Sequence, residues 1–189
     1  SESAAPPIRL VTLSANGHEV KAGNETVLFR HEKTFYYKPG LFIRVRDDET
    51  TEAIREKVAL ADAYEVVYVG IELAVDGFAV ESVSGDPAVF AQSVEVVRSV
   101  SQRPLILIAN DPEVIAAGLE ATDGKGTLIY GANSDNWEAM AGLAKAKGAS
   151  LAVTAGSLGE LAELTETIKG RGVENLVVDP GARDFSASL

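Results

Sequence analysis

Short apolar segments recur at an almost constant spacing through the second half of the chain. Their first leucines are Leu105, Leu128, Leu151 and Leu176, so the steps between them are 23, 23 and 25 residues. Each segment is continuously apolar, as a parallel strand covered on both faces requires. Each step has room for one helix and two short loops, which together make one βα unit. The even spacing favours a (β/α)8 barrel over a doubly wound sheet.

Helix start and stop signals fill the intervals between these segments. Asp111-Pro112 places an N-cap aspartate before a proline at the first helical position. Ser157 and Glu160 have the spacing of a capping box, and Gly148 stands where a helix needs a left-handed stop. An apolar stripe at helical spacing predicts a face that packs on the sheet, made of Leu158, Leu161, Ala162, Thr165 and Ile168.

The first half of the chain supplies the remaining elements. Asn16-Gly17 predicts an N-terminal β-hairpin, which we place at the bottom of the barrel. Leu41–Val45 and Phe78–Val83 are expected as the first two barrel strands, with Glu65–Val75 as an addition between them. The predicted fold is therefore α/β, of the (β/α)8 TIM-barrel type, with six of the eight βα units present. The predicted parts are a linker (1–7), the hairpin with a charged-aromatic loop (8–40) and the incomplete barrel (41–189).

The charge and composition of the chain limit its partners. A net charge of −11 and a pI near 4.6 argue against nucleic acid, which attracts clusters of lysine and arginine. The chain has no cysteine, so it forms no disulfide and ligates no iron–sulfur cluster through thiolates. No apolar run approaches the roughly 20 residues that span a bilayer. We therefore expect a soluble, cytoplasmic protein.

Three polar residues follow the carboxyl ends of predicted parallel strands. They are Asn110, Asn133 and Asp179. In a closed barrel these residues converge on one mouth, where two amides and a carboxylate match the edge of a flat heterocycle such as a pterin. The alternative is that they cap helices and shape turns, a role that asparagine and aspartate favour at such positions. We prefer this second interpretation.

Ser157 also lies in a Gly-Ser-Leu-Gly turn between a predicted strand and helix, which imitates a hydrolase nucleophile elbow. In that fold the catalytic histidine follows the serine in the sequence, whereas His18 and His31 both precede it. An N-cap role is a sufficient explanation for Ser157. We identify no independent catalytic residue in this chain.

A charged and aromatic stretch lies between the hairpin and the first predicted barrel strand. Histidine is a common general acid or base, so the stretch is compatible with a catalytic cluster. It is equally compatible with a solvated charge run beside aromatic residues that anchor an interface loop, and spacing alone does not choose between the two. The candidate residues are Arg30, His31, Lys33, Phe35 and Tyr36.

Five segments spread over the chain share the pattern of one known family. They are Ala5–Pro7, Leu28–Tyr36, Asn133, Trp137–Met140 and Asp179–Arg183. Together they resemble the large (gamma) subunit of the corrinoid iron–sulfur proteins, which serve the carbon monoxide dehydrogenase/acetyl-CoA synthase system. Tyr37 departs from the pattern, because the family often has histidine at that position.

The resemblance implies a place for this chain within a larger subunit. The family's large subunit has a four-cysteine [4Fe-4S] domain, a (β/α)8 barrel and a cobalamin-binding domain, and this chain corresponds to the barrel. Cobalamin and the [4Fe-4S] cluster are therefore expected in the intact subunit, with neither ligated by this portion.

The resemblance also implies a function and its partners. The family carries a methyl group from methyltetrahydropterin to acetyl-CoA synthase. The expected partners are the small subunit, whose barrel is similar, together with the methyltransferase and acetyl-CoA synthase. The barrel is then a scaffold and interaction domain, and the alternative is a pterin-binding methyltransferase barrel.

Overall fold

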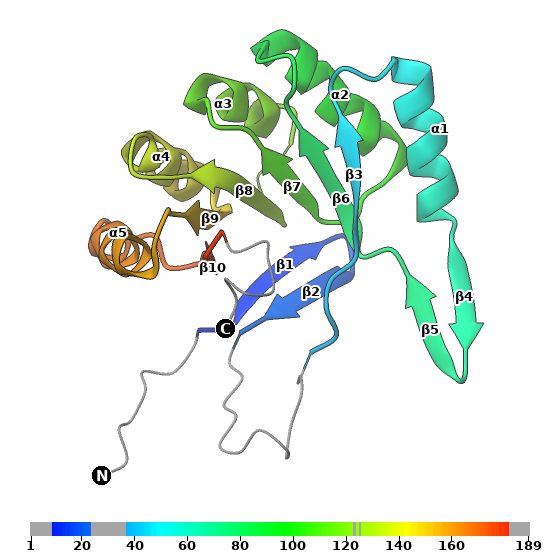
Figure 1. Ribbon diagram of the computed structural model, residues 1–189. Helices are drawn as coiled ribbons and strands as arrows, with labels where there is room; N and C mark the ends of the chain where they lie inside the picture. The colour runs from blue at the N-terminus through cyan, green and yellow to red at the C-terminus, as the bar shows by residue number, and fades with distance from the viewer. Residues whose placement is uncertain (1–8, 24–36, 123, 125, 182–189) are drawn as a thin grey trace.

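The computed structural model describes residues 9–23, 37–122, 124 and 126–181. Its main element is a sheet of six parallel strands, with five helices along the outer side (Figure 1). The strands of this sheet are β3 (Phe42–Arg46), β6 (Gly77–Glu81), β7 (Leu105–Ile108), β8 (Thr127–Ala132), β9 (Ser150–Thr154) and β10 (Leu176–Asp179). The helices are α1 (Thr51–Asp62), α2 (Pro87–Val100), α3 (Pro112–Glu120), α4 (Trp137–Lys147) and α5 (Leu158–Gly170).

The six strands lie in the sheet in the order of the sequence, from β3 through β6, β7, β8 and β9 to β10. Every pairing between them is parallel. The prediction that the evenly spaced strands are parallel and adjacent is therefore confirmed. A doubly wound sheet reverses its strand order at one point, and the described residues contain no such reversal. Within this part of the chain, β3 and β10 are the outermost strands and each has one free edge.

The predicted helix signals act as expected. The carboxylate of Asp111 accepts a hydrogen bond from the backbone N–H of Glu113 at 2.8 Å, with Pro112 at the first helical position. The hydroxyl of Ser157 accepts from the N–H of Glu160 at 3.3 Å, which begins α5. Gly148 ends α4 with a φ of 67°, a left-handed conformation that glycine adopts without steric cost.

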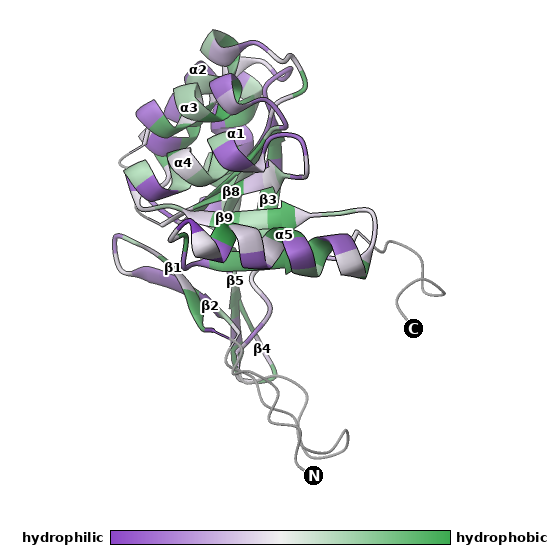
Figure 2. Cartoon of the chain, turned by 90° about the vertical axis from the view of Figure 1, so that its left-hand side faces the viewer, coloured by the Kyte–Doolittle hydropathy of each residue, from purple (hydrophilic) through white to green (hydrophobic). Residues whose placement is uncertain are grey.

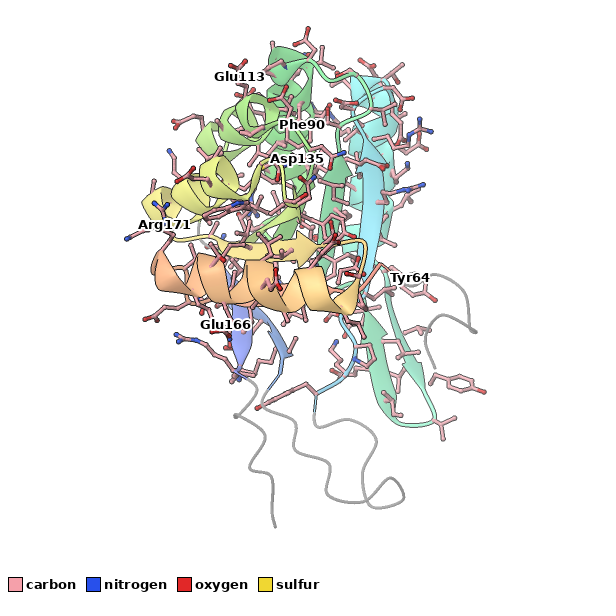
Figure 3. All side chains as sticks on the ribbon, turned by 60° about the vertical axis from the view of Figure 1, so that its left-hand side comes forward. Tyr64, Phe90, Glu113, Asp135, Glu166 and Arg171 are labelled. Carbon is pink, nitrogen blue, oxygen red and sulfur yellow. The ribbon has the colours of Figure 1, made fainter. Side chains whose placement is uncertain are left out.

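The main core lies between the sheet and the helices. Phe78, Leu107 and Ile129 point from three neighbouring strands toward the helix layer and are fully buried. Phe90 of α2, labelled in Figure 3, belongs to the same core cluster and also has no exposed surface. A Cβ atom added at Gly118 of α3 would lie 2.5 Å from Cε1 of Phe90, so glycine is what lets α3 approach this ring.

The apolar stripe predicted for α5 is only partly correct. Leu161 and Ile168 are buried against the sheet, but Leu158 is 73% exposed. Leu158 and Thr165 instead line a shallow groove of about 290 Å³ that reaches Val178 of β10. The physical reason is the position of α5 in the series. Among the described residues α5 has a helix neighbour on one side only, so part of its apolar surface stays uncovered.

An antiparallel pair of short strands packs against the inner side of the sheet. These strands are β1 (Val11–Ala15) and β2 (His18–Ala22), joined at Asn16 and Gly17, which both have positive φ. Leu13 of β1 contacts a small apolar cluster with Leu128 and Ala152 on the inner face of the sheet. A Cβ at Gly126 would lie 2.5 Å from the carbonyl oxygen of Ser14. Because Gly126 directly precedes β8, the pair lies at the amino ends of the parallel strands.

A second antiparallel pair interrupts the βα series after α1. It consists of β4 (Glu65–Tyr68) and β5 (Ile71–Ala74), which form a separate two-stranded sheet. Figure 1 shows this pair extending from the body, and Figure 2 shows it below the body in a perpendicular view. The stretch of β-forming residues predicted as an addition between the first two barrel strands is therefore a protruding ribbon.

Candidate functional site

The carboxyl ends of the six parallel strands form one edge of the sheet, which we call the carboxyl edge. Side chains alternate between the two faces of a strand, so the inner-face positions near this edge are set by the register. They include several polar residues, namely Arg46, Glu81, Tyr130, Thr154 and Asp179. Proteins built from βα units place their sites at this edge. The carboxyl edge is therefore the candidate functional site.

Both carboxylate oxygens of Asp179 accept hydrogen bonds. The hydroxyl of Tyr130 donates a hydrogen bond to Oδ2, which links β8 to β10 across β9. The backbone N–H of Gly181 donates to Oδ1 at 2.8 Å, and Gly181 has a φ of 71°. The Asp-Pro-Gly sequence thus forms an Asx-type turn at the end of its strand.

Asn133 and Asn136 organise the loop between β8 and α4. Oδ1 of Asn133 accepts from the N–H of Asp135 at 2.9 Å. Nδ2 of Asn136 donates to the carbonyl oxygens of Asn110, at 2.7 Å, and of Gly131, at 3.0 Å. Its Oδ1 accepts from the N–H of Asn133 at 2.8 Å. Asn136 therefore joins the loops that follow two neighbouring strands.

Gly131 brings these loops close together. It has a φ of 129° and lies where the register between β8 and β9 shifts, as at a β-bulge. A Cβ atom at this position would lie 2.2 Å from the carbonyl oxygen of Ala109 and 3.2 Å from Oδ1 of Asn110. Only glycine permits both the backbone conformation and the close approach of the preceding strand.

Asp47 forms a second bonded centre at the carboxyl edge, directly after β3. It is 3% exposed, and its Oδ1 accepts from the N–H groups of Val83 at 2.7 Å and Ser84 at 2.9 Å. Its Oδ2 accepts from the hydroxyls of Ser82 and Ser84. Burial acts to raise the pKa of Asp47, but the hydrogen bonds from Ser84, Val83 and Ser82 outweigh it and lower the pKa. The ionised carboxylate holds the loop between β6 and α2 against β3.

The structure places all three predicted mouth residues at the carboxyl edge. Asn110 follows β7, Asn133 follows β8, and Asp179 ends β10. Asn136 connects the first two, whereas the bonds described above connect Asp179 to Tyr130 and Gly181. Binding of a pterin by Asn110, Asn133 and Asp179 stays a prediction. The other candidate residues, Arg30, His31, Lys33, Phe35 and Tyr36, lie outside the described residues.

Sequence reasoning missed three residues that organise this edge: Tyr130, Asn136 and Asp47. The available signals were weak. Tyr130 read as one more apolar strand residue, and Asn136 as one polar residue among several before a helix. Asp47 is one of several polar residues that follow the first predicted strand, and no local motif distinguishes it from them. Tyr130 binds a residue 49 positions away, Asp47 binds residues 35 to 37 positions away, and Asn136 reaches Asn110 across 26 positions, so no local pattern reveals these contacts.

A shallow cavity of about 580 Å³ lies on the outer side of the carboxyl edge, between the starts of α3 and α4. Pro112, Asp135 and Trp137 are among its lining residues, and Figure 3 shows Asp135 in the loop before α4. Within the described ranges, no group of three histidine or acidic side chains is placed to hold a metal ion. None of the helices in this part of the chain is long and apolar enough to cross a bilayer.

Comparison with known proteins gives a match over almost the whole chain. The family model described as CO dehydrogenase/acetyl-CoA synthase delta subunit matches residues 10–188. The chain is 38% identical over 187 residues to the corrinoid/iron-sulfur protein large subunit of Moorella thermoacetica, covering 99% of this chain and 42% of that protein.

Archaeal proteins match over a similar extent. The acetyl-CoA decarbonylase/synthase complex subunit gamma 2 of Methanosarcina mazei is 38% identical over 178 residues, which cover 94% of this chain and 38% of that protein. The gamma subunit of Archaeoglobus fulgidus is 37% identical over 188 residues, covering 100% of this chain and 40% of that protein. The chain thus spans about two fifths of the length of these relatives.

Proposed function

We propose that this chain, which belongs to the CO dehydrogenase/acetyl-CoA synthase delta subunit family, is the barrel portion of a corrinoid methyl-carrier subunit. In this proposal the barrel is a scaffold and interaction domain, and the carrier passes a methyl group from methyltetrahydropterin to acetyl-CoA synthase. Cobalamin and the [4Fe-4S] cluster belong to other portions of the subunit. The chain contains no cysteine, so it does not supply the thiolates that hold such a cluster.

The observation that carries the proposal is the incomplete βα series. Six parallel strands follow in sequence order, and β3 and β10 each keep a free edge within the described residues. Parallel strands are normally covered on both faces, and an open edge strand exposes a row of unpaired backbone groups. Val178 of β10 is 52% exposed, and the groove beside α5 is open. Two further βα units would pair both edges, cover this groove and close a (β/α)8 barrel.

The contacts at the carboxyl edge support a structural role over a catalytic one. Oδ1 of Asp179 and Oδ1 of Asn133 accept hydrogen bonds within their own turns, and Oδ2 of Asp179 accepts from Tyr130. Asn136 joins two loops through the Asn110 and Gly131 carbonyls. Groups bonded in this way fix the shape of the edge. A pterin-binding site would instead need these oxygens and amides to face a shared cavity.

The alternative function is a pterin-binding methyltransferase barrel. One observation favours it, namely the placement of Asn110, Asn133 and Asp179 at the same edge of one sheet. This edge is where proteins of this architecture bind their ligands. The alternative therefore requires Asp179 to exchange its bonds with Tyr130 and Gly181 for bonds to the ligand.

The comparisons support a particular partner for the scaffold. A family model named for delta subunits matches a chain whose curated relatives are named gamma or large subunits. We infer that the two kinds of subunit share a similar region, as the resemblance implies for the large and small subunits. We therefore propose that the main partner is the small subunit, bound barrel to barrel, and that the methyltransferase and acetyl-CoA synthase bind the assembled carrier in the cytoplasm.

Co-purification tests the scaffold proposal. When the full-length subunit is produced together with the small subunit, we expect a stable one-to-one complex that survives gel filtration. We also expect the isolated full-length subunit to have no methyltransferase activity of its own. A full-length subunit that stays alone in the presence of the small subunit would contradict the scaffold role. Pterin-dependent methyl transfer by that isolated subunit would favour the alternative.

A further inference from the structure

The protruding ribbon has two faces of different chemistry. We call the segment from Tyr64 to Ala74 the arm. The register pairs Val66 with Leu73 and Tyr68 with Ile71, so these four side chains share one face. All of them are substantially exposed, from 41% for Val66 to 68% for Tyr68. The opposite face pairs Glu65 with Ala74 and Val67 with Glu72, so it carries the acidic groups of the arm.

Such a ribbon gains little stability from its own contacts. An isolated two-stranded hairpin is marginal in water, because it buries too little apolar surface. Monomeric proteins also rarely leave a continuous group of large apolar side chains in contact with solvent. The arm is a two-stranded hairpin and its large apolar side chains are exposed to solvent. Figure 1 shows it standing away from the helices and the six-stranded sheet. Its apolar face therefore has no explanation within the described fold.

The tip of the arm adds to this observation. Val69 has a φ of 51° and is 84% exposed, and Gly70 beside it has a φ of 76°. A two-residue turn of this kind favours asparagine followed by glycine, and a β-branched residue in the left-handed region is strained. A valine at this position is unfavourable for folding. It is favourable when the tip contacts an apolar surface.

The base of the arm, in contrast, is firmly attached to the body. The guanidinium of Arg103 donates to Oδ1 of Asp62 at 2.8 Å and to the carbonyl oxygen of Val75 at 2.7 Å. Asp62 ends α1 just before the arm, and Val75 directly follows it. The hydroxyl of Ser101 also donates to Asp62. Figure 3 shows Tyr64 where the arm leaves the body. Both ends are thus fixed before any partner binds, which reduces the entropy lost on binding.

We propose that the arm is a docking element for another subunit of the same complex, whose surface there is apolar and bordered by lysine or arginine. The inference deepens the scaffold role proposed above and depends on it. The charge of the chain argues for this partner. Glu65 and Glu72 are the only charged side chains of the arm, and the whole chain carries a net charge of −11. A second copy would bring two strongly acidic chains together, whereas a basic border complements the arm.

A pair of matched substitutions tests the docking role. Ile71 and Val67 are 63% and 64% exposed, and they lie on opposite faces of the same ribbon. In the full-length subunit we would compare Ile71→Ser with Val67→Ser. A double variant, Tyr68→Ser/Ile71→Ser, should show a larger loss of affinity than Ile71→Ser alone. Binding to the small subunit would be measured by calorimetry, and to the methyltransferase and acetyl-CoA synthase if that affinity is unchanged.

We expect the Tyr68→Ser/Ile71→Ser variant to lose about 30-fold or more in affinity for one of these subunits, as interface hot spots do. The Val67→Ser variant should stay within about threefold of the wild type. Both variants should keep the thermal unfolding temperature of the wild type, because the arm lies outside the core.

The contrary results are distinguishable. If the wild type binds its partners and the double variant binds all of them equally well, the docking role is wrong while the scaffold role stands. If the wild type binds none of them, the scaffold role fails and the docking role with it. Self-association of the wild-type subunit that the double variant abolishes would identify a second copy on the arm, and would overturn the proposed partner. Equal losses of affinity in the Val67→Ser variant and in the double variant would show a general disturbance of the arm, and would contradict docking through its apolar face.

Discussion

Replacing Phe90 by alanine is expected to lower the free energy of unfolding by about 3–5 kcal/mol. Phe90 has no exposed surface and fills the space between α2, α3 and the sheet. Its loss removes the transfer free energy of the ring and leaves a cavity that the rigid sheet closes only in part. Urea unfolding of the subunit measures the change. Val89→Ala, on the same helix at a site 37% exposed, is the control and should cost about 1 kcal/mol or less.

Gly118 provides an internal check on this result. In the wild type, Gly118→Ala would push a methyl group to 2.5 Å from the Phe90 ring, which should cost about 1–3 kcal/mol. In the Phe90→Ala background that contact is gone, and alanine favours the helix by up to about 1 kcal/mol over glycine. We therefore expect the same substitution to become neutral or stabilising there. Additive effects of the two changes would show that the ring and Gly118 do not pack together.

Replacing Asp47 by alanine is expected to cost about 3 kcal/mol, because the groups that bond to this buried carboxylate lose their charged acceptor. Val83 and Ser84 each donate a backbone hydrogen bond to this carboxylate, and the hydroxyls of Ser82 and Ser84 add two more. The control is Asp48→Ala. This substitution removes an exposed ion pair with Arg46, because the side chain of Asp48 is 44% exposed. Exposed pairs contribute about 1 kcal/mol at most. Similar losses for the two variants would contradict the structural role of Asp47.

The pH dependence of stability offers a second test of Asp47. Its pKa in the folded state is lowered, because the hydrogen bonds from Ser84, Val83 and Ser82 outweigh the effect of burial. A lowered pKa stabilises the folded state above the unfolded pKa, which is about 3.9 for aspartate. This stabilisation is lost as the pH falls through the folded pKa. The difference in stability between wild type and Asp47→Asn should be constant above about pH 5 and shrink below about pH 4. A difference that grows on acidification would contradict this.

Local patterns in the sequence predicted the sheet well. Continuous apolar segments at a regular spacing required buried parallel strands, and the order of the strands followed from one helix per interval. The caps at Asp111 and Ser157 were also predictable, because a cap residue and its target are two or three residues apart. Such features depend on neighbours in the sequence, so the sequence alone contains their evidence.

Features that depend on distant partners were not predictable. Asp47 binds residues more than 30 positions away, and Tyr130 binds Asp179, which is 49 residues further along the chain. The stripe on α5 was predicted as core, yet the exposure of Leu158 depends on whether a further unit packs beside it. The β-forming residues of the arm predicted strands correctly. Their exposure to solvent was not predictable, because it depends on the arm extending away from the helices and the six-stranded sheet.

In our proposal this chain is a scaffold and not a pterin-binding enzyme. Calorimetric titration of the full-length subunit with methyltetrahydrofolate distinguishes the two functions. If Asp179, Asn110 and Asn133 serve turns and loops, the titration should give no binding heat at millimolar ligand. Asp179→Ala should then change only stability, through the lost bonds to Tyr130 and Gly181. Micromolar binding that Asp179→Ala abolishes would contradict the scaffold account.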